Sequence, residues 1–183
     1  MRIRLISLSA GAAALIGAAA GVGTAAATPS ASTPTRFAYV CGVGAEKVED
    51  WRCVTRSTTG DRIELTVAGS FATDAKSISG GGAFIRWSRD GRAVQGTGTW
   101  TAEQLVRFTP YGDGSAQGEP SQFWGGEALI RVRLSTGQRG VLSLVCRVGH
   151  PPKNALEGFG LRLDRGPDFN RPVNGETGFA ALP

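Results

Sequence analysis

Two glutamates occupy the positions best suited to acid–base chemistry. Glu127 and Glu157 each begin an expected strand, and Glu157 alternates with Phe159, Leu161 and Leu163, so its side chain is expected to point inward. Burial raises the pKa of a carboxyl group and lets it act as a general acid. A second carboxylate about 5–10 Å away across one pocket would complete a pair that cleaves glycosidic bonds. The competing and favoured interpretation is that both acids reach solvent or pair with an arginine.

Other catalytic and metal-binding chemistry has few candidate residues. His150 is the only histidine, and it stands in a Gly-His-Pro-Pro sequence at a strand end. One histidine cannot supply a multi-histidine zinc site, and the HExxH and CxxC spacings are absent. The nucleophile motif GxSxG and the acidic spacing of calcium loops are absent as well. We therefore predict no metal and no cofactor, and we interpret His150 as a loop residue.

Aromatic residues gather in the longest segment without an expected strand, residues 110–126, which is rich in Gly, Ser, Gln and Pro. This segment contains Tyr111, Phe123 and Trp124. Long loops in compact domains are often functional, and exposed rings offer flat platforms for sugars or partner proteins. We predict that these three residues bind a ligand. The alternative is that the rings only pack the loop against the domain.

The first 27 residues have the layout of a secretory signal peptide. Arg2 and Arg4 form a basic start, an Ala/Gly-rich apolar run follows, and three alanines at 25–27 provide a cleavage site. Residues 28–35 are a Pro/Ser/Thr linker, and residues 36–183 are expected to form a single domain. A membrane anchor would need about 20 strongly apolar residues. We therefore predict a secreted, extracellular protein without membrane association after cleavage.

The charge balance is only mildly basic. Twenty Lys and Arg against 15 Asp and Glu give a formal net charge of +5, which falls to +3 without the two arginines of the leader. Nucleic-acid-binding domains usually carry a dense basic face, and RNA-binding sheets add interleaved aromatic residues. Neither pattern is present, so no nucleic-acid partner is predicted.

The chain has three cysteines, Cys41, Cys53 and Cys146. In an exported protein, one disulfide and one remaining thiol are expected. Cys41 and Cys53 flank a short polar connection and could clip a hairpin, so we favour this pair. A bridge between Cys53 and Cys146 is the rival, and spacing alone does not decide between the two. Trp51 alternates with Cys53 and is expected in the core.

Alternation of apolar and polar residues recurs along the domain, and no convincing helical periodicity appears. Glycines inside the alternating segments are typical of kinked and coiled strands. We predict an all-β domain of about 8–10 antiparallel strands, either a β-barrel or a β-sandwich, with the barrel slightly favoured. The expected strands span residues 37–43, 51–56, 62–68, 82–88, 93–101, 104–109, 127–134, 141–149, 157–164 and 177–182.

One hairpin is expected over residues 82–101. Asp90 and Gly91 are typical of a type I′ turn, in which both central residues have positive φ. Centring the hairpin on this turn points Trp87 into the core and Phe84 outward, because neighbouring residues of a strand face opposite sides.

A second hairpin is expected between residues 127–134 and 141–149. Ile130 on the first segment, and Leu142 and Leu144 on the second, fall on the apolar side of each strand. These residues are expected in the core.

Two segments resemble known proteins. GGGAFIRWSRDGRAVQGTGTWTA at 80–102 and GPDFNRPVNGETGF at 166–179 resemble small exported bacterial β-proteins without an assigned activity. This resemblance spans most of residues 36–183 and implies no catalytic or ligand-binding residue. The glycine-rich strand pair is also similar to barrels of the dirigent and allene oxide cyclase type. That similarity implies barrel geometry and assigns no functional residue.

Three functions follow as hypotheses. The leading one is an extracellular, non-catalytic binding protein that holds a saccharide or a small apolar molecule at a barrel mouth lined by the aromatic residues of 110–126. The second is an enzyme, either a barrel-type isomerase or cyclase, or a glycan-cleaving hydrolase that uses Glu127 and Glu157. The third is a secreted inhibitor or toxin that docks on a protein. Whether the two glutamates share one pocket separates the first hypothesis from the hydrolase.

Overall fold

The computed structural model describes residues 33–43 and 52–183, and their regular structure is β-strand apart from one short 3-10 turn. The expected leader, most of the linker and Trp51 lie outside these residues. No helix in the described part of the chain is long and apolar enough to cross a membrane. The all-β expectation is confirmed. The strands are β1 (Arg36–Val43), β2 (Cys53–Ser57), β3 (Arg62–Leu65), β4 (Val67–Ala72), β5 (Ser77–Trp87), β6 (Val94–Asp113), β7 (Phe123–Leu134), β8 (Arg139–Cys146), β9 (Gly158–Leu163), β10 (Asp168–Asn174) and β11 (Glu176–Ala181).

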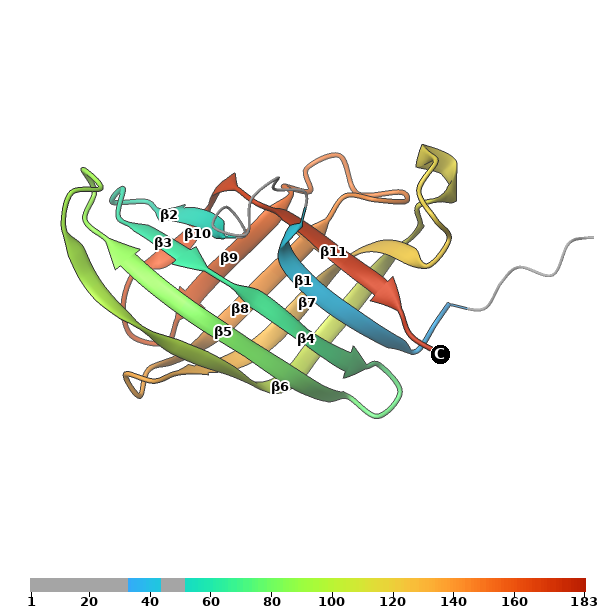
Figure 1. Cartoon of the computed structure of the whole chain (residues 1–183), viewed down its shortest axis with the longest axis horizontal. Coiled ribbons are helices and arrows are strands. Elements are labelled where there is room, and N and C mark those ends of the chain that lie inside the picture. The colour runs from blue at the N-terminus through green and yellow to red at the C-terminus, as the bar shows by residue number, and fades with distance from the viewer. Residues whose placement is uncertain (1–32, 44–51) are drawn as a thin grey trace, which may run out of the picture. The chain divides into compact units, whose positions relative to one another are not determined.

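The strands form one antiparallel sheet that closes on itself through hydrogen bonds (Figure 1). Two rings share the long strands β5, β6 and β7. An eight-stranded ring continues through β8, β9, β10, β2 and β3, and a six-stranded ring continues through β11, β1 and β4. The sheet is therefore barrel-like. The strands differ from the expected ones at three places. The segment predicted at 62–68 divides at Thr66, β10 was not predicted, and the segments predicted at 93–101 and 104–109 are one strand, β6.

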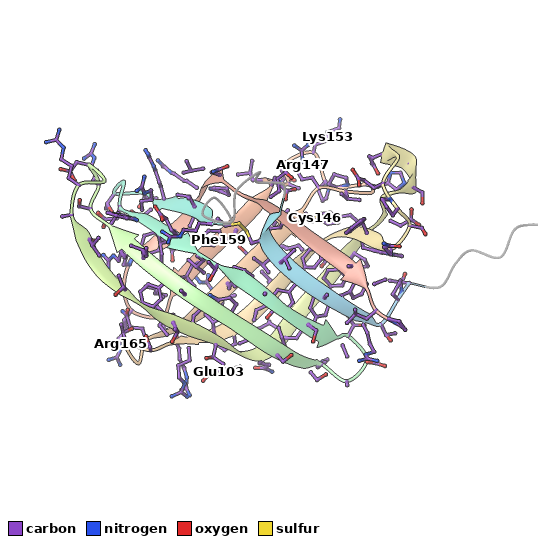
Figure 2. All side chains as sticks on the ribbon, viewed as in Figure 1. Glu103, Cys146, Arg147, Lys153, Phe159 and Arg165 are labelled. Atoms are coloured by element: carbon purple, nitrogen blue, oxygen red, sulfur yellow. A yellow bond between two sulfur atoms is a disulfide. The ribbon has the colours of Figure 1, made fainter. Side chains whose placement is uncertain are left out.

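Side chains fill the space inside the sheet. In the six-stranded ring, Phe108 packs against Phe37, Phe71 and Phe179 with ring centroids 4.8, 4.9 and 5.1 Å apart. In the eight-stranded ring, a void lined by Ile63, Phe84 and Leu142, among others, measures only about 10 Å³, and Phe159 points into this interior (Figure 2). The interior is a packed core, so a ligand site has to be sought at the rim or on the outer face.

The first expected hairpin forms between β5 and β6, but the prediction of which β5 side chains point into the core is wrong. Phe84 is buried, whereas Trp87 lies half-buried on the outer face, 5.2 Å below the Arg62 guanidinium. The cause is an irregularity between Arg86 and Trp87 that shifts the register by one residue. Such a shift moves every side chain of a strand to the opposite face.

The turn of this hairpin also differs from the prediction. Ser88 N–H donates to the Ala93 carbonyl oxygen at 2.8 Å, which leaves a loop of four residues instead of two. Gly91 has a φ of +71°, but Asp90 does not have positive φ. The Asp90 carboxylate instead accepts hydrogen bonds from the Ser88 hydroxyl and the Arg92 N–H. Asp90 therefore stabilises the loop through its side chain.

The second expected hairpin, β7–β8, is confirmed. Ile130 pairs with Leu142, Ala128 pairs with Leu144, and all four side chains are fully buried. The Cys41–Cys53 disulfide is confirmed as well, with Cα atoms 5.9 Å apart, and it joins the end of β1 to the start of β2. The rival bridge to Cys146 is therefore excluded, and Cys146 is a free thiol.

Both ends of the segment predicted as a loop at 110–126 are strand. β6 continues to Asp113 and β7 begins at Phe123, with Asp113 paired to Trp124. The connecting residues 114–122 contain the 3-10 turn Ser115–Gln117. Bulges along β6 break the alternation that the prediction relied on, which explains why these strand ends were missed.

Candidate functional site

A groove lies beside β11, where this strand leaves β7; we call it the seam groove. Two residue pairs join β11 to β7, Phe179–Trp124 and Ala180–Phe123. The groove has a volume of about 260 Å³. Outward-facing residues of β1 and β11 form one wall, and the start of β7 with the residues after β8 forms the other. Its lining is mostly apolar and includes Ala38, Val40, Phe123, Trp124, Val148 and Ala180.

Phe123 and Trp124 both line the seam groove, as adjacent residues on opposite faces of β7. Phe123 points outward and is 38% exposed, whereas Trp124 is 8% exposed and packs edge-on against the core residue Phe37 at 6.0 Å. The two predicted residues therefore come together, but in different roles. Phe123 offers its ring to a ligand, and Trp124 joins the groove to the core.

The connection between β6 and β7 is held against the connection after β8. Gln117 donates from Nε2 to the Gly149 carbonyl oxygen at 2.7 Å and accepts from Gly149 N–H at 3.2 Å. Gly114 N–H donates to the Phe123 carbonyl oxygen at 2.9 Å. These bonds position Glu119, which lines the seam groove together with Glu176 of β11. The groove therefore combines an apolar floor with two acidic side chains.

Cys146 ends β8 and lines the same groove, near the end of the barrel that also carries Arg147 (Figure 2). Its side chain is only 5% exposed. Burial raises the pKa of the Cys146 thiol from 9.0 to about 11, because the charged thiolate is poorly solvated there. The thiol is therefore neutral near pH 7 and contributes an apolar surface to the groove.

We expect Cys146 to react slowly with Ellman's reagent in the folded protein. At pH 8, a pKa of about 11 in place of 9.0 lowers the thiolate fraction about 100-fold, and burial slows access further. The reaction rate should rise up to about pH 11, and the same protein in guanidinium chloride should react at once. Equal rates in the folded and unfolded protein at pH 8 would contradict this prediction.

The raised pKa of the Cys146 thiol also makes the stability of the fold depend on pH. By linkage, the stability conferred by the buried neutral thiol is complete below pH 9.0 and is lost as the pH rises through about 11.

Tyr111, the third predicted ligand residue, lies elsewhere. It lines a second depression, the outer cleft, on the outer face of β7, β8 and β10, with a volume of about 360 Å³. Glu127 lines the outer cleft too, and its carboxylate pairs with Arg107 at 3.0 Å. Burial first, and then the negative charge of Glu127, raises the pKa of Tyr111, while Arg107 lowers it. Tyr111 and Glu127 are thus neighbours, although separate roles are predicted for them from the sequence.

Glu157 lies apart from the lining of both the seam groove and the outer cleft, and its carboxylate connects two strands. Its carboxylate accepts hydrogen bonds from Arg147 N–H at 2.7 Å and Thr177 N–H at 2.8 Å. The buried Thr177 hydroxyl is shared between the Glu157 carboxylate, at 2.7 Å, and the Val145 carbonyl oxygen. Glu157 therefore ties β11 to β8 at the seam. It does not line the cleft that contains Glu127, so no paired-carboxylate site is assembled there.

His150 and the described acidic residues show no metal-binding arrangement. His150 is exposed, and its backbone N–H donates to the Tyr111 carbonyl oxygen at 2.7 Å. Within residues 33–43 and 52–183, no group of three or more His, Cys, Asp or Glu side chains is placed to hold a metal ion.

Sequence reasoning found the aromatic half of the seam groove and missed the rest. Nothing in the strand that ends at Cys146 indicates that β11 lies beside it. Glu119 and Glu176 lie far apart in the sequence and meet because the chain closes the barrel with β11. Comparisons of the chain with protein-family models, with curated proteins and with solved structures find no match.

Proposed function

We propose that this chain is an exported, non-catalytic binding protein whose seam groove holds a small apolar molecule. The observation that carries the proposal is the apolar groove beside β11, in which Phe123 keeps an exposed ring next to Val40 and Ala180. Small-molecule sites are typically concave and mostly apolar, with a few polar groups that orient the ligand.

The charges at the groove favour a ligand with a positive end. Glu119 and Glu176 are the acidic residues of its lining, and among the described residues no lysine or arginine lines it. A bound cation would be attracted by both carboxylates, whereas a carboxylate ligand would be repelled. The ligand class is therefore an apolar molecule, preferably flat, that carries an ammonium group.

Export and the absence of catalysis belong to the same proposal. The Cys41–Cys53 disulfide supports export, because disulfides persist in oxidising compartments, and the leader-like residues 1–27 agree with it. Glu127 and Glu157 are each engaged by neighbouring groups, Arg107 for the first and backbone N–H groups for the second. These contacts support non-catalytic roles for both carboxylates.

The test is a titration with 2-naphthylmethylamine, followed by calorimetry or by the rise in melting temperature. A ligand that binds only the folded state raises the midpoint of unfolding. Phe123→Ala should weaken binding at least about tenfold, because burying a phenylalanine contributes about 1.5–3 kcal/mol and 1.4 kcal/mol is a factor of ten. Glu176→Gln should reduce the preference for the amine over 2-naphthylacetate.

Val94→Ala is the matched control, because Val94 is 53% exposed and is not part of the groove lining. This variant should bind the amine as the unaltered protein does. The proposal fails if the unaltered protein binds neither naphthyl compound, or if Phe123→Ala binds the amine with undiminished affinity.

A further inference from the structure

Two glycines of β9 lie beside residues that line the outer cleft. Phe159 and Leu161 of β9 point into the core, so the alternating residues Gly158 and Gly160 face outward and carry no side chain. A Cβ at Gly160 would lie 2.9 Å from Ser143 Oγ and 3.3 Å from the Phe169 carbonyl oxygen. A side chain at Gly160 would therefore crowd Ser143, which lines the cleft.

The walls of the outer cleft supply hydrogen-bonding groups of several kinds. Ser143 stands on β8 and Asn170 on β10, and Asn154 belongs to the connection between β8 and β9. An amide side chain both donates and accepts, and a hydroxyl does the same. Such groups match the vicinal hydroxyls of a sugar, each of which also donates and accepts.

Tyr111 adds an aromatic surface and Glu127 a strong acceptor to the same cleft. Leu156, which is 64% exposed, completes an apolar edge. A pyranose ring has an apolar face of C–H groups and a rim of hydroxyls. One aromatic ring next to amides, a hydroxyl and a carboxylate is the combination that complements both parts.

The charge of the outer cleft is balanced. The Glu127 carboxylate is paired with Arg107 at 3.0 Å, and Lys153, from the same connection as Asn154, projects away from the sheet (Figure 2). Neither an anion nor a cation gains an unpaired counter-charge from these side chains. The cleft therefore suits an uncharged ligand, in contrast to the acidic seam groove.

We infer that the outer cleft is a binding site for an uncharged saccharide, in which Tyr111 stacks on a sugar ring while Glu127, Asn154 and Asn170 bind its hydroxyls. Its volume of about 360 Å³ lies within the range of about 300–1,000 Å³ common for small-molecule sites. The inference is independent of the function proposed for the seam groove, because the two sites share no lining residue.

Saturation-transfer difference NMR with cellobiose, chitobiose and maltose tests the inference on the intact domain. At least one disaccharide should receive magnetisation from the protein. Tyr111→Ala should abolish the transfer or weaken the affinity at least about tenfold, whereas Tyr111→Phe, which keeps the ring, should retain it. Asn170→Ala, at an exposed position, should also weaken binding and serves if Tyr111→Ala does not fold.

Phe123→Ala separates the two proposals. It should leave saccharide binding unchanged, just as Tyr111→Ala should leave binding of 2-naphthylmethylamine unchanged. The inference is overturned if none of the three disaccharides receives magnetisation, or if folded Tyr111→Ala and Asn170→Ala both bind the sugar like the unaltered protein. Loss of sugar binding in Phe123→Ala together with retention in Tyr111→Ala would assign the sugar to the seam groove and would equally overturn it.

Discussion

Replacing Gly82 with alanine should destabilise the domain by about 3 kcal/mol, because the new methyl group has no room. A Cβ at Gly82 would lie 1.9 Å from the carbonyl oxygen of Thr66 and 2.8 Å from its hydroxyl oxygen. Thr66 is the residue between β3 and β4. The contact is with backbone, so a side-chain rotation cannot relieve it, and β4 or β5 has to move.

The displacement would break the hydrogen bonds that Thr66 makes with Trp100 and Ala83. The Thr66 carbonyl oxygen accepts from the Trp100 indole N–H at 3.0 Å, and the Thr66 hydroxyl accepts from Ala83 N–H at 2.8 Å. Thr66 N–H donates to the Ala83 carbonyl oxygen at 3.0 Å. Moving Thr66 therefore leaves the buried Trp100 indole without its acceptor, which adds to the steric cost.

Gly96→Ala is the matched control, on the partner strand β6. A Cβ at Gly96 meets no heavy atom within 4 Å, so alanine should be neutral or should stabilise by up to about 1 kcal/mol through a less flexible unfolded chain. Guanidinium denaturation followed by circular dichroism measures both variants. Equal stability of Gly82→Ala and Gly96→Ala would show that Thr66 and β5 are less tightly packed than described.

Removing the Cys41–Cys53 disulfide should cost about 3 kcal/mol. The bond closes a loop between residues 12 apart in the sequence, and a crosslink of about this span restricts the unfolded chain by that amount. Both half-cystines are buried and join β1 to β2, which occupy different rings of the sheet. Loss of the bond should therefore loosen the junction between the two rings.

The measurement compares Cys146→Ala with the triple variant that also carries Cys41→Ala and Cys53→Ala. The shared Cys146→Ala background removes thiol exchange with the remaining cysteine, and alanine avoids burying a new hydroxyl. The midpoint of guanidinium denaturation should fall markedly in the triple variant. If the two midpoints coincide, the crosslink does not stabilise the domain by restricting the unfolded chain.

The sequence was most informative where neighbours along the chain are neighbours in the sheet. The β7–β8 hairpin follows from unbroken alternation, so Ile130 and Leu142 could be placed in the core from their spacing alone. The β5–β6 hairpin could not be placed in this way. One irregularity beside Trp87 reverses which side chains of β5 point into the core. The sequence of the four-residue loop does not indicate this irregularity.

The same limit applies to the candidate site, because only residues close together in the sequence could be grouped in advance. Phe123 and Trp124 are adjacent residues and were found from composition, whereas Tyr111 is close in sequence but faces another surface. The inward direction expected for Glu157 came from local alternation. Its actual partner, Thr177, is 20 residues away and could be recognised only after β11 had been placed beside β8.

The pairing of β1 with β11 has a consequence for how the chain reaches this state. Arg36 contacts Pro183 across 147 residues, and β11 joins both β1 and β7. A ribosome or a secretion channel delivers the amino-terminal end first, so β1 waits with one unpaired edge until residues 176–181 emerge. Closure thus depends on the most distant contacts in the chain, which are slow to form. During that interval, the exposed edge of β1 is a site where nascent copies can pair with each other or with a chaperone.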